Sequence, residues 1–187
     1  MYEPLLTCLD AIVCTKQGWD TKTVGEAYGL IKRITDSTFI ASFQTVLHFF
    51  GYTKGLSCKL QGAALDIVQG YEMVTSITSV LMHARQNEQE YNVVYDKMIA
   101  MVNVIGNGAS LEVPRRCGRQ TQRSNIPAET PKEYFTLAIY IPYLDSLIQQ
   151  FNMRFGDLTK QAVRGLCQIP SYAVRDTVNS DELLHCY

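Results

Sequence analysis

The stretch EQEYNVVYDKMIAMVNVIGNG, residues 88 to 108, decides the fold class of this chain. Its apolar residues recur at steps of three and four, which is the spacing of one face of an α-helix. The cluster Gly106–Asn107–Gly108 follows directly and favours the left-handed backbone conformation that ends a helix. The stretch therefore predicts an amphipathic helix that stops at Gly106.

The same helical spacing recurs along most of the chain, whereas no segment shows sustained strand alternation. Further predicted helices cover about residues 23–34, 36–50, 54–61 and 65–85. Gly51 is predicted to end the second of these, because glycine is a poor helix former and a common helix stop. We therefore predict an all-α protein, an irregular helical bundle.

A capping box opens the last predicted helix. Thr130 stands three residues before Glu133, and Pro131 occupies the first helical position. The apolar face of this helix continues to Phe155. Pro142 should kink it, because proline removes a backbone donor in mid-helix.

The connector at about residues 106–130 is non-periodic and basic, which makes it the one long loop of the predicted bundle. It places four arginines within nine residues, and no acid occurs between Pro114 and Glu129. A loop of this length is either functional or loosely ordered. The four residues are Arg115, Arg116, Arg119 and Arg123.

Two interpretations of these arginines compete. In one they donate hydrogen bonds to carboxylates and carbonyl groups at helix ends and hold the loop in place. In the other they contact the phosphates of DNA. We predict a division between the two, with Arg115 and Arg116 on DNA and Arg119 in the structural role.

Composition restricts the classes of function. The chain has 187 residues, 17 basic and 18 acidic side chains and a net charge of −1, so only a local patch can attract DNA. Its apolar runs are far shorter than the roughly 20 residues of a membrane span, and no basic N-terminal region indicates a signal peptide. We predict a single helical domain over residues 1–187, with an unassigned tail at 171–187, and no membrane partner.

Neither the cysteines nor the histidines form a recognisable metal motif. Six scattered cysteines without CxxC spacing favour reduced thiols in the cytosol or nucleus. Cys117 lies among arginines that favour a reactive thiol, but it has no histidine partner nearby in the sequence. His48 and His83 are interpreted as ordinary packed or surface histidines, and Glu182 with His185 lacks the first histidine of HExxH. With the carboxylates dispersed as well, we predict no metal, no cofactor and no catalytic residue.

Three blocks of sequence carry a resemblance to a known family. They are LSCKLQGAALDIVQGYE at 56–72, PRRCGRQTQRSNIPAETPKEYF at 114–135 and IYIPYLDSLIQQFNMRF at 139–155. In order and spacing they resemble the hAT superfamily of DNA transposases. The resemblance is closest to the branch that includes MYM-type zinc-finger proteins and the repressor of the inhibitor of the protein kinase, and it extends more weakly over most of the chain.

The resemblance implies that this chain corresponds to the helical insertion of the family's ribonuclease-H-like domain. The family's two Asp and one Glu, which bind divalent metal for strand cleavage, would lie before Met1 and beyond Tyr187. It also implies a nuclear location (otherwise the cytoplasm) and no catalytic role for any residue here, so the chain as given is not an enzyme.

We therefore predict a non-catalytic fragment of a transposase-derived protein with a weak, sequence-independent DNA contact. Two alternatives stay open. One is a regulatory protein–protein interaction module, with a protein partner or self-association. The other is part of an active transposase, if the true product is longer.

Overall fold

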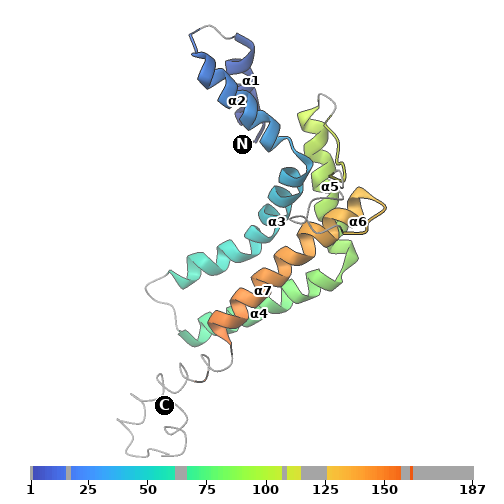
Figure 1. The fold of residues 1–187 in the computed structure, drawn as a ribbon. Helices are drawn as coiled ribbons and strands as arrows, with labels where there is room; N and C mark the ends of the chain where they lie inside the picture. Colours follow the sequence, from blue (N-terminus) through green and yellow to red (C-terminus); the bar gives the residue numbers. More distant parts are fainter. Residues whose placement is uncertain are drawn as a thin grey trace, which may run out of the picture. The chain divides into compact units, whose positions relative to one another are not determined.

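The computed structural model describes residues 2–15, 18–61, 67–106, 109–114, 126–156 and 161. Every regular element among them is helical, and this part of the chain contains no strand (Figure 1). The elements are α1 (Tyr2–Thr15), α2 (Thr21–Ile34), α3 (Ser37–Leu60), α4 (Ile67–Gln86), α5 (Glu88–Ile105), α6 (Pro131–Phe135), η1 (Thr136–Tyr140) and α7 (Ile141–Phe155). The predicted all-α class is therefore confirmed. Within the described ranges, no helix is both long and apolar enough to span a membrane.

Helix ends that depend on local chemistry lie where the sequence predicts them. Helix α5 ends at Ile105, and Gly106 follows with a φ of 61°. Thr130 caps α6, since its hydroxyl oxygen accepts a hydrogen bond from the backbone of Glu133 at 3.2 Å. The Glu133 carboxylate in turn accepts from the backbone N–H of Glu129 at 2.9 Å, one residue before the usual capping-box partner.

The prediction that Gly51 ends a helix is wrong. Helix α3 runs through Gly51 without interruption and joins the segments predicted separately at 36–50 and 54–61. Phe49 and Leu56 are buried on either side of Gly51, with exposed fractions of 0% and 3%. Burial of these side chains outweighs the roughly 1 kcal/mol that glycine costs inside a helix.

Helix α1 is an element that the sequence patterns did not indicate. It packs against α2 and buries Leu9. The Tyr2 hydroxyl donates a hydrogen bond to the Ile34 carbonyl at the end of α2, and the Tyr2 ring lies 6.0 Å from that of Phe43. Contacts with α2 and α3 thus stabilise α1.

Pro142 distorts the last long helix in a specific way. The five residues of η1, which ends two residues before Pro142, form a π-helical turn, and the Ile141 N–H donates to the Thr136 carbonyl five residues back. Because proline lacks an N–H and its ring crowds the carbonyl four residues earlier, a widened turn at this point relieves the clash. The expected disturbance at Pro142 therefore takes the form of a π-turn on its N-terminal side.

Residue contacts divide the chain into two compact units. The first comprises Met1–His48 and Glu88–Pro142, and the second comprises Phe49–Asn87 and Tyr143–Tyr187. The core of the first unit includes Ile40, Val94, Met98, Phe135 and Tyr140. That of the second includes Phe49, Val74, Leu81, Leu144 and Ile148. Helices α3 and α7 each contribute residues to both units, and the prediction of a single domain stays a prediction.

Candidate functional site

The four arginines predicted to contact DNA, Arg115, Arg116, Arg119 and Arg123, lie outside the described residues. Their role therefore stays a prediction. The two flanks of this basic segment are described, and each makes hydrogen bonds to a helix of the first unit.

The N-terminal flank is held at the start of α3. The Ser37 hydroxyl donates to the Ser110 carbonyl at 2.9 Å and accepts from the backbone N–H of Glu112 at 3.1 Å. The Ser110 hydroxyl donates to the Glu112 carboxylate at 2.7 Å. One serine side chain thus fixes the chain shortly before the first arginine.

The C-terminal flank leads into α6, which is held on α5 by Tyr91. The Tyr91 hydroxyl donates to the Lys132 carbonyl at 2.8 Å, and its ring meets that of Tyr140 edge to face with centroids 4.8 Å apart. The ammonium of Lys132 also lies 3.7 Å from a carboxylate oxygen of Glu88. Both ends of the basic segment are therefore anchored on the same unit.

Burial of Tyr91 should make stability sensitive to alkaline pH. Burial raises the pKa of Tyr91 to about 12, above its ordinary value of about 10. Between these two values the unfolded chain binds fewer protons than the folded chain, so stability falls as the pH rises; below pH 10 the contribution is fully present. We expect Tyr91→Phe to make the free energy of unfolding less dependent on pH between about 10 and 12.

Urea denaturation at a series of pH values measures this effect. Some pH dependence should remain in the variant, because burial also raises the pKa of Tyr2, Tyr95 and Tyr143. If the free energy of unfolding of the variant depended on pH as steeply as that of the wild type, the assignment to Tyr91 would be contradicted. At neutral pH the variant should lose about 1 kcal/mol with the hydrogen bond to Lys132.

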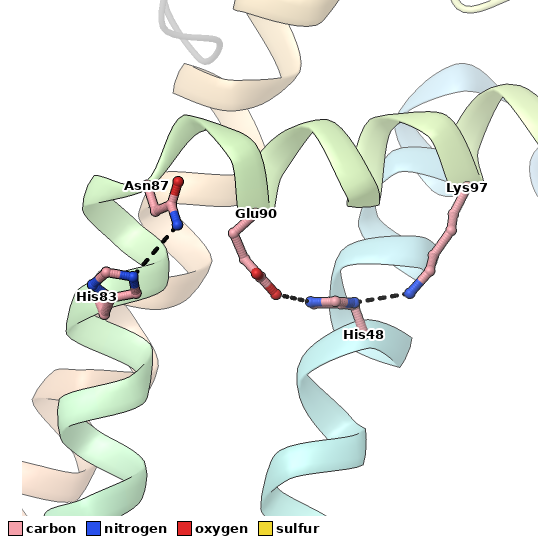
Figure 2. Close-up of polar contacts among 5 residues, drawn as sticks. All are labelled: His48, His83, Asn87, Glu90 and Lys97. Atoms are coloured by element: carbon pink, nitrogen blue, oxygen red, sulfur yellow. Dashed lines mark hydrogen bonds and ion pairs between the residues drawn. The ribbon is translucent and has the colours of Figure 1, made fainter.

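A polar cluster within the first unit joins α3 to α5 (Figure 2). His48 extends from α3 toward α5, where its Nε2 lies 2.7 Å from Oε1 of Glu90. On the other side of the ring, Nδ1 lies 3.0 Å from Nζ of Lys97. The His48 side chain is only 9% exposed, so protein groups surround most of the imidazole.

The partners of His48 determine its tautomer. An ammonium group can only donate, so Nδ1 must accept a hydrogen bond from Lys97. The neutral ring then carries its proton on Nε2 and donates it to the Glu90 carboxylate. A carboxylate thus orients an imidazole whose acceptor nitrogen faces an amine, which is the arrangement of a positioned base beside a nucleophile.

An apolar groove of about 480 Å³ lies beside this cluster, between α1, α3 and α5. Lys97 is part of its wall, and Glu3 is its acidic member. The other lining residues are Tyr2, Phe43, Gln44, Leu47, Ala100, Met101 and Val104. The groove therefore combines an amine with largely apolar surroundings.

In the second unit, an ion pair joins two helices. The Nε of Arg85 donates a hydrogen bond to one carboxylate oxygen of Asp145, and its Nη2 donates to the other oxygen at 3.0 Å. Hydrogen bonds from Arg85 hold the pKa of Asp145 below its usual value. Because both side chains are well exposed, this pair links α4 to α7 without forming an enclosed site.

The remaining sequence candidates are placed as follows. His83 lies exposed on α4 with its Nε2 3.4 Å from the Asn87 amide, which fits an ordinary surface histidine (Figure 2). Cys8, Cys14 and Cys58 are free and exposed. Among the residues described, no group of three or more His, Cys, Asp and Glu side chains could hold a metal ion. Cys117, Glu182 and His185 lie outside these residues.

Comparison with known proteins gives one recurring similarity. No protein-family model and no solved structure matches the chain. Over 189 residues it is 21% identical to the 52 kDa repressor of the inhibitor of the protein kinase from Mus musculus, and over 188 residues 20% identical to the Homo sapiens protein of the same name. Each alignment covers 99% of this chain and 24% of the relative.

The similarity is to a repressor. This chain spans about a quarter of the length of the curated relatives that it matches. The match agrees with the branch that the sequence blocks resemble.

Sequence reasoning did not find the contacts of His48. Glu90 and Lys97 lie 42 and 49 residues further along the chain, so no local spacing signals the cluster. Helical periodicity places His48 on α3 and Glu90 on α5, but only the packing of these helices brings the side chains together.

Proposed function

We propose that this chain is a non-catalytic helical binding region of a protein descended from a hAT transposase. The observation that carries the proposal is the similarity of this chain, over 99% of its length, to 24% of each of two proteins that are named as repressors. A regulatory role of that kind depends on binding rather than on bond cleavage. The helical character of the described residues supports correspondence with the family's helical insertion.

We assign a weak, sequence-independent DNA contact to the basic segment, residues 115–123. Four arginines without an intervening acid form a local positive charge on a chain whose net charge is only −1. The described flanks of this segment are held by hydrogen bonds of Ser37 and Tyr91. Arginine contacts to phosphates give affinity without reading the base sequence.

The test is the affinity for duplex DNA at several salt concentrations. If all four arginines contacted phosphates, log affinity against log salt would have a slope of about −3.6, from about −0.9 for each contact. We expect a shallower slope. We also expect the double variant Arg115→Ala/Arg116→Ala to weaken binding to unrelated sequences alike, with little change in Tm, whereas Arg119→Ala chiefly lowers Tm.

The matched control is Lys22→Ala/Lys32→Ala, which removes two positive charges from α2. It should leave the affinity for DNA nearly unchanged. If Arg115→Ala/Arg116→Ala binds duplex DNA at low salt as tightly as the wild type does, the proposed DNA contact is contradicted.

A second candidate function is self-association, which an apolar stripe on α3 favours. Phe39, Phe43, Val46 and Leu47 recur at helical spacing and are 37–52% exposed. No charged residue occurs between Ser37 and Leu47, so an identical stripe on a second copy could pack there without charge repulsion. We therefore name a second copy of this chain as the occupant.

Sedimentation velocity over a range of concentrations tests this candidate. Val46→Glu should shift the chain toward monomer, because it buries a charge at the contact. Met153→Glu changes an apolar side chain that is 70% exposed elsewhere and should have no such effect. A wild type that stays monomeric at every concentration would exclude self-association.

A further inference from the structure

The His48–Glu90–Lys97 cluster has the geometry of an activated amine beside a binding groove. We infer that Lys97 is a covalent modification site, acylated by a neutral acyl thioester whose chain binds in the apolar groove. This inference goes beyond the proposed DNA contact and does not depend on it. It competes with self-association, because Phe43 and Leu47 belong both to the groove and to the apolar stripe on α3. It rests on two independent observations, the hydrogen bonds of His48 and the composition of the groove.

The first observation concerns activation of the amine. When an amine attacks a carbonyl carbon, its nitrogen must give up a proton as the C–N bond forms, and a nearby base can take that proton. The acceptor nitrogen Nδ1 of His48 lies 3.0 Å from Nζ of Lys97, within reach for a direct transfer. The Glu90 carboxylate, 2.7 Å from Nε2, orients the ring and stabilises the imidazolium that forms.

The second observation concerns the substrate. Lys97 lines a groove of about 480 Å³, within the range of about 300–1,000 Å³ that is typical of ligand pockets. Its apolar walls, including Phe43, Leu47 and Val104, suit an acyl chain, and the Glu3 carboxylate disfavours an anionic one. The groove therefore favours a neutral, apolar acyl donor.

The reaction is a stoichiometric acyl transfer. The Lys97 ammonium first loses one proton to water, and the nitrogen lone pair forms a C–N bond with the thioester carbonyl carbon. As that bond forms, Nδ1 of His48 takes a second proton from the nitrogen. The carbon–sulfur bond then breaks, and the departing sulfur takes this proton from His48, so the products are an amide on Lys97 and a free thiol.

The full chain is incubated with the octanoyl thioester of N-acetylcysteamine, and acylation of each lysine is followed by peptide mass spectrometry. Hydroxylamine removes acyl groups from the exposed cysteines before analysis, because thioesters are cleaved and amides are not. The internal reference is Lys22. Its side chain is well exposed and lies 3.9 Å from the Glu26 carboxylate. We expect Lys97 to react at least about tenfold faster than Lys22, a modest gain for a positioned base.

Variants separate base catalysis from a structural effect. His48→Gln should lower the rate at Lys97 to that of Lys22, with the rate at Lys22 unchanged. Imidazole added to His48→Ala should restore part of the rate, which a purely structural role of His48 would not allow. Glu90→Gln, a change in a positioning residue, should give an intermediate rate that imidazole does not raise.

The groove is tested by chain length. The ratio of octanoyl to acetyl transfer should be higher at Lys97 than at Lys22. Val104→Asp should lower that ratio, and the Val104 side chain is 60% exposed, so folding should be unaffected. Equal rates at Lys97 and Lys22 in the wild type would overturn the inference. Equal ratios of octanoyl to acetyl transfer at the two lysines would also contradict it, because the groove would then not bind the acyl chain.

Discussion

Replacing Phe49 with alanine is expected to lower the free energy of unfolding by about 3–5 kcal/mol. The Phe49 side chain is fully buried, and its ring centroid lies 6.0 Å from that of Tyr52 and 6.1 Å from that of Tyr143. The loss combines the transfer free energy of the ring with the cavity that it leaves. Since domains of this size are stable by only about 5–15 kcal/mol, such a loss is a large fraction of the total.

Urea denaturation followed by circular dichroism at 222 nm (the wavelength of the helix signal) measures the change. The matched control is Phe50→Ala, which makes the same chemical change at the next residue, where the side chain is 53% exposed. We expect the control to lose only about 0.5 kcal/mol. Similar losses in the two variants would mean that the buried face of α3 is assigned incorrectly.

Gly51→Pro is expected to lower the free energy of unfolding by about 3 kcal/mol or more, because Gly51 lies in the interior of α3. Proline there removes a helical hydrogen bond, and its ring collides with the carbonyl four residues earlier. Gly51→Ala should have the opposite effect and raise the free energy of unfolding by about 0.5–1 kcal/mol. A Cβ added at Gly51 meets no atom within 4 Å, and its φ is not in the left-handed region.

The pair of Gly51 variants distinguishes the continuous helix from the helix stop that the sequence predicts. At a left-handed helix stop, alanine would be destabilising, because its Cβ clashes with the backbone there. Gly106, with a φ of 61°, is such a position and serves as the control. If Gly51→Ala and Gly106→Ala lost stability equally, the continuous α3 would be contradicted.

Local sequence signals succeeded wherever the deciding contacts span four residues or fewer. The cap at Thr130 depends on the backbone of Glu133, and the end of α5 depends on the backbone freedom of Gly106. Periodicity also placed α4 and α5 within two residues of their observed bounds. Such features are set by hydrogen bonds and torsion angles near the residue itself.

The same reasoning was wrong at Gly51 and missed α1. At Gly51 local propensity weighs against a helix and packing outweighs it; α1 is also packed against another helix. Phe49 and Leu56 are buried around Gly51, and Leu9 is buried as α1 packs on α2. Burial of apolar area is worth more than one unfavourable helical residue, but the partner that buries it cannot be read from nearby sequence.

The sequence by itself determined that this protein is helical, where most of its helices lie and that its positive charge is concentrated at residues 115–123. Only the tertiary structure decided that Ser37 and Tyr91 hold the flanks of that segment and that His48 lies between Glu90 and Lys97. The physical reason is range. Helix formation depends on contacts within one or two turns, whereas these side chains meet across 41 to 75 residues, when separate helices pack together.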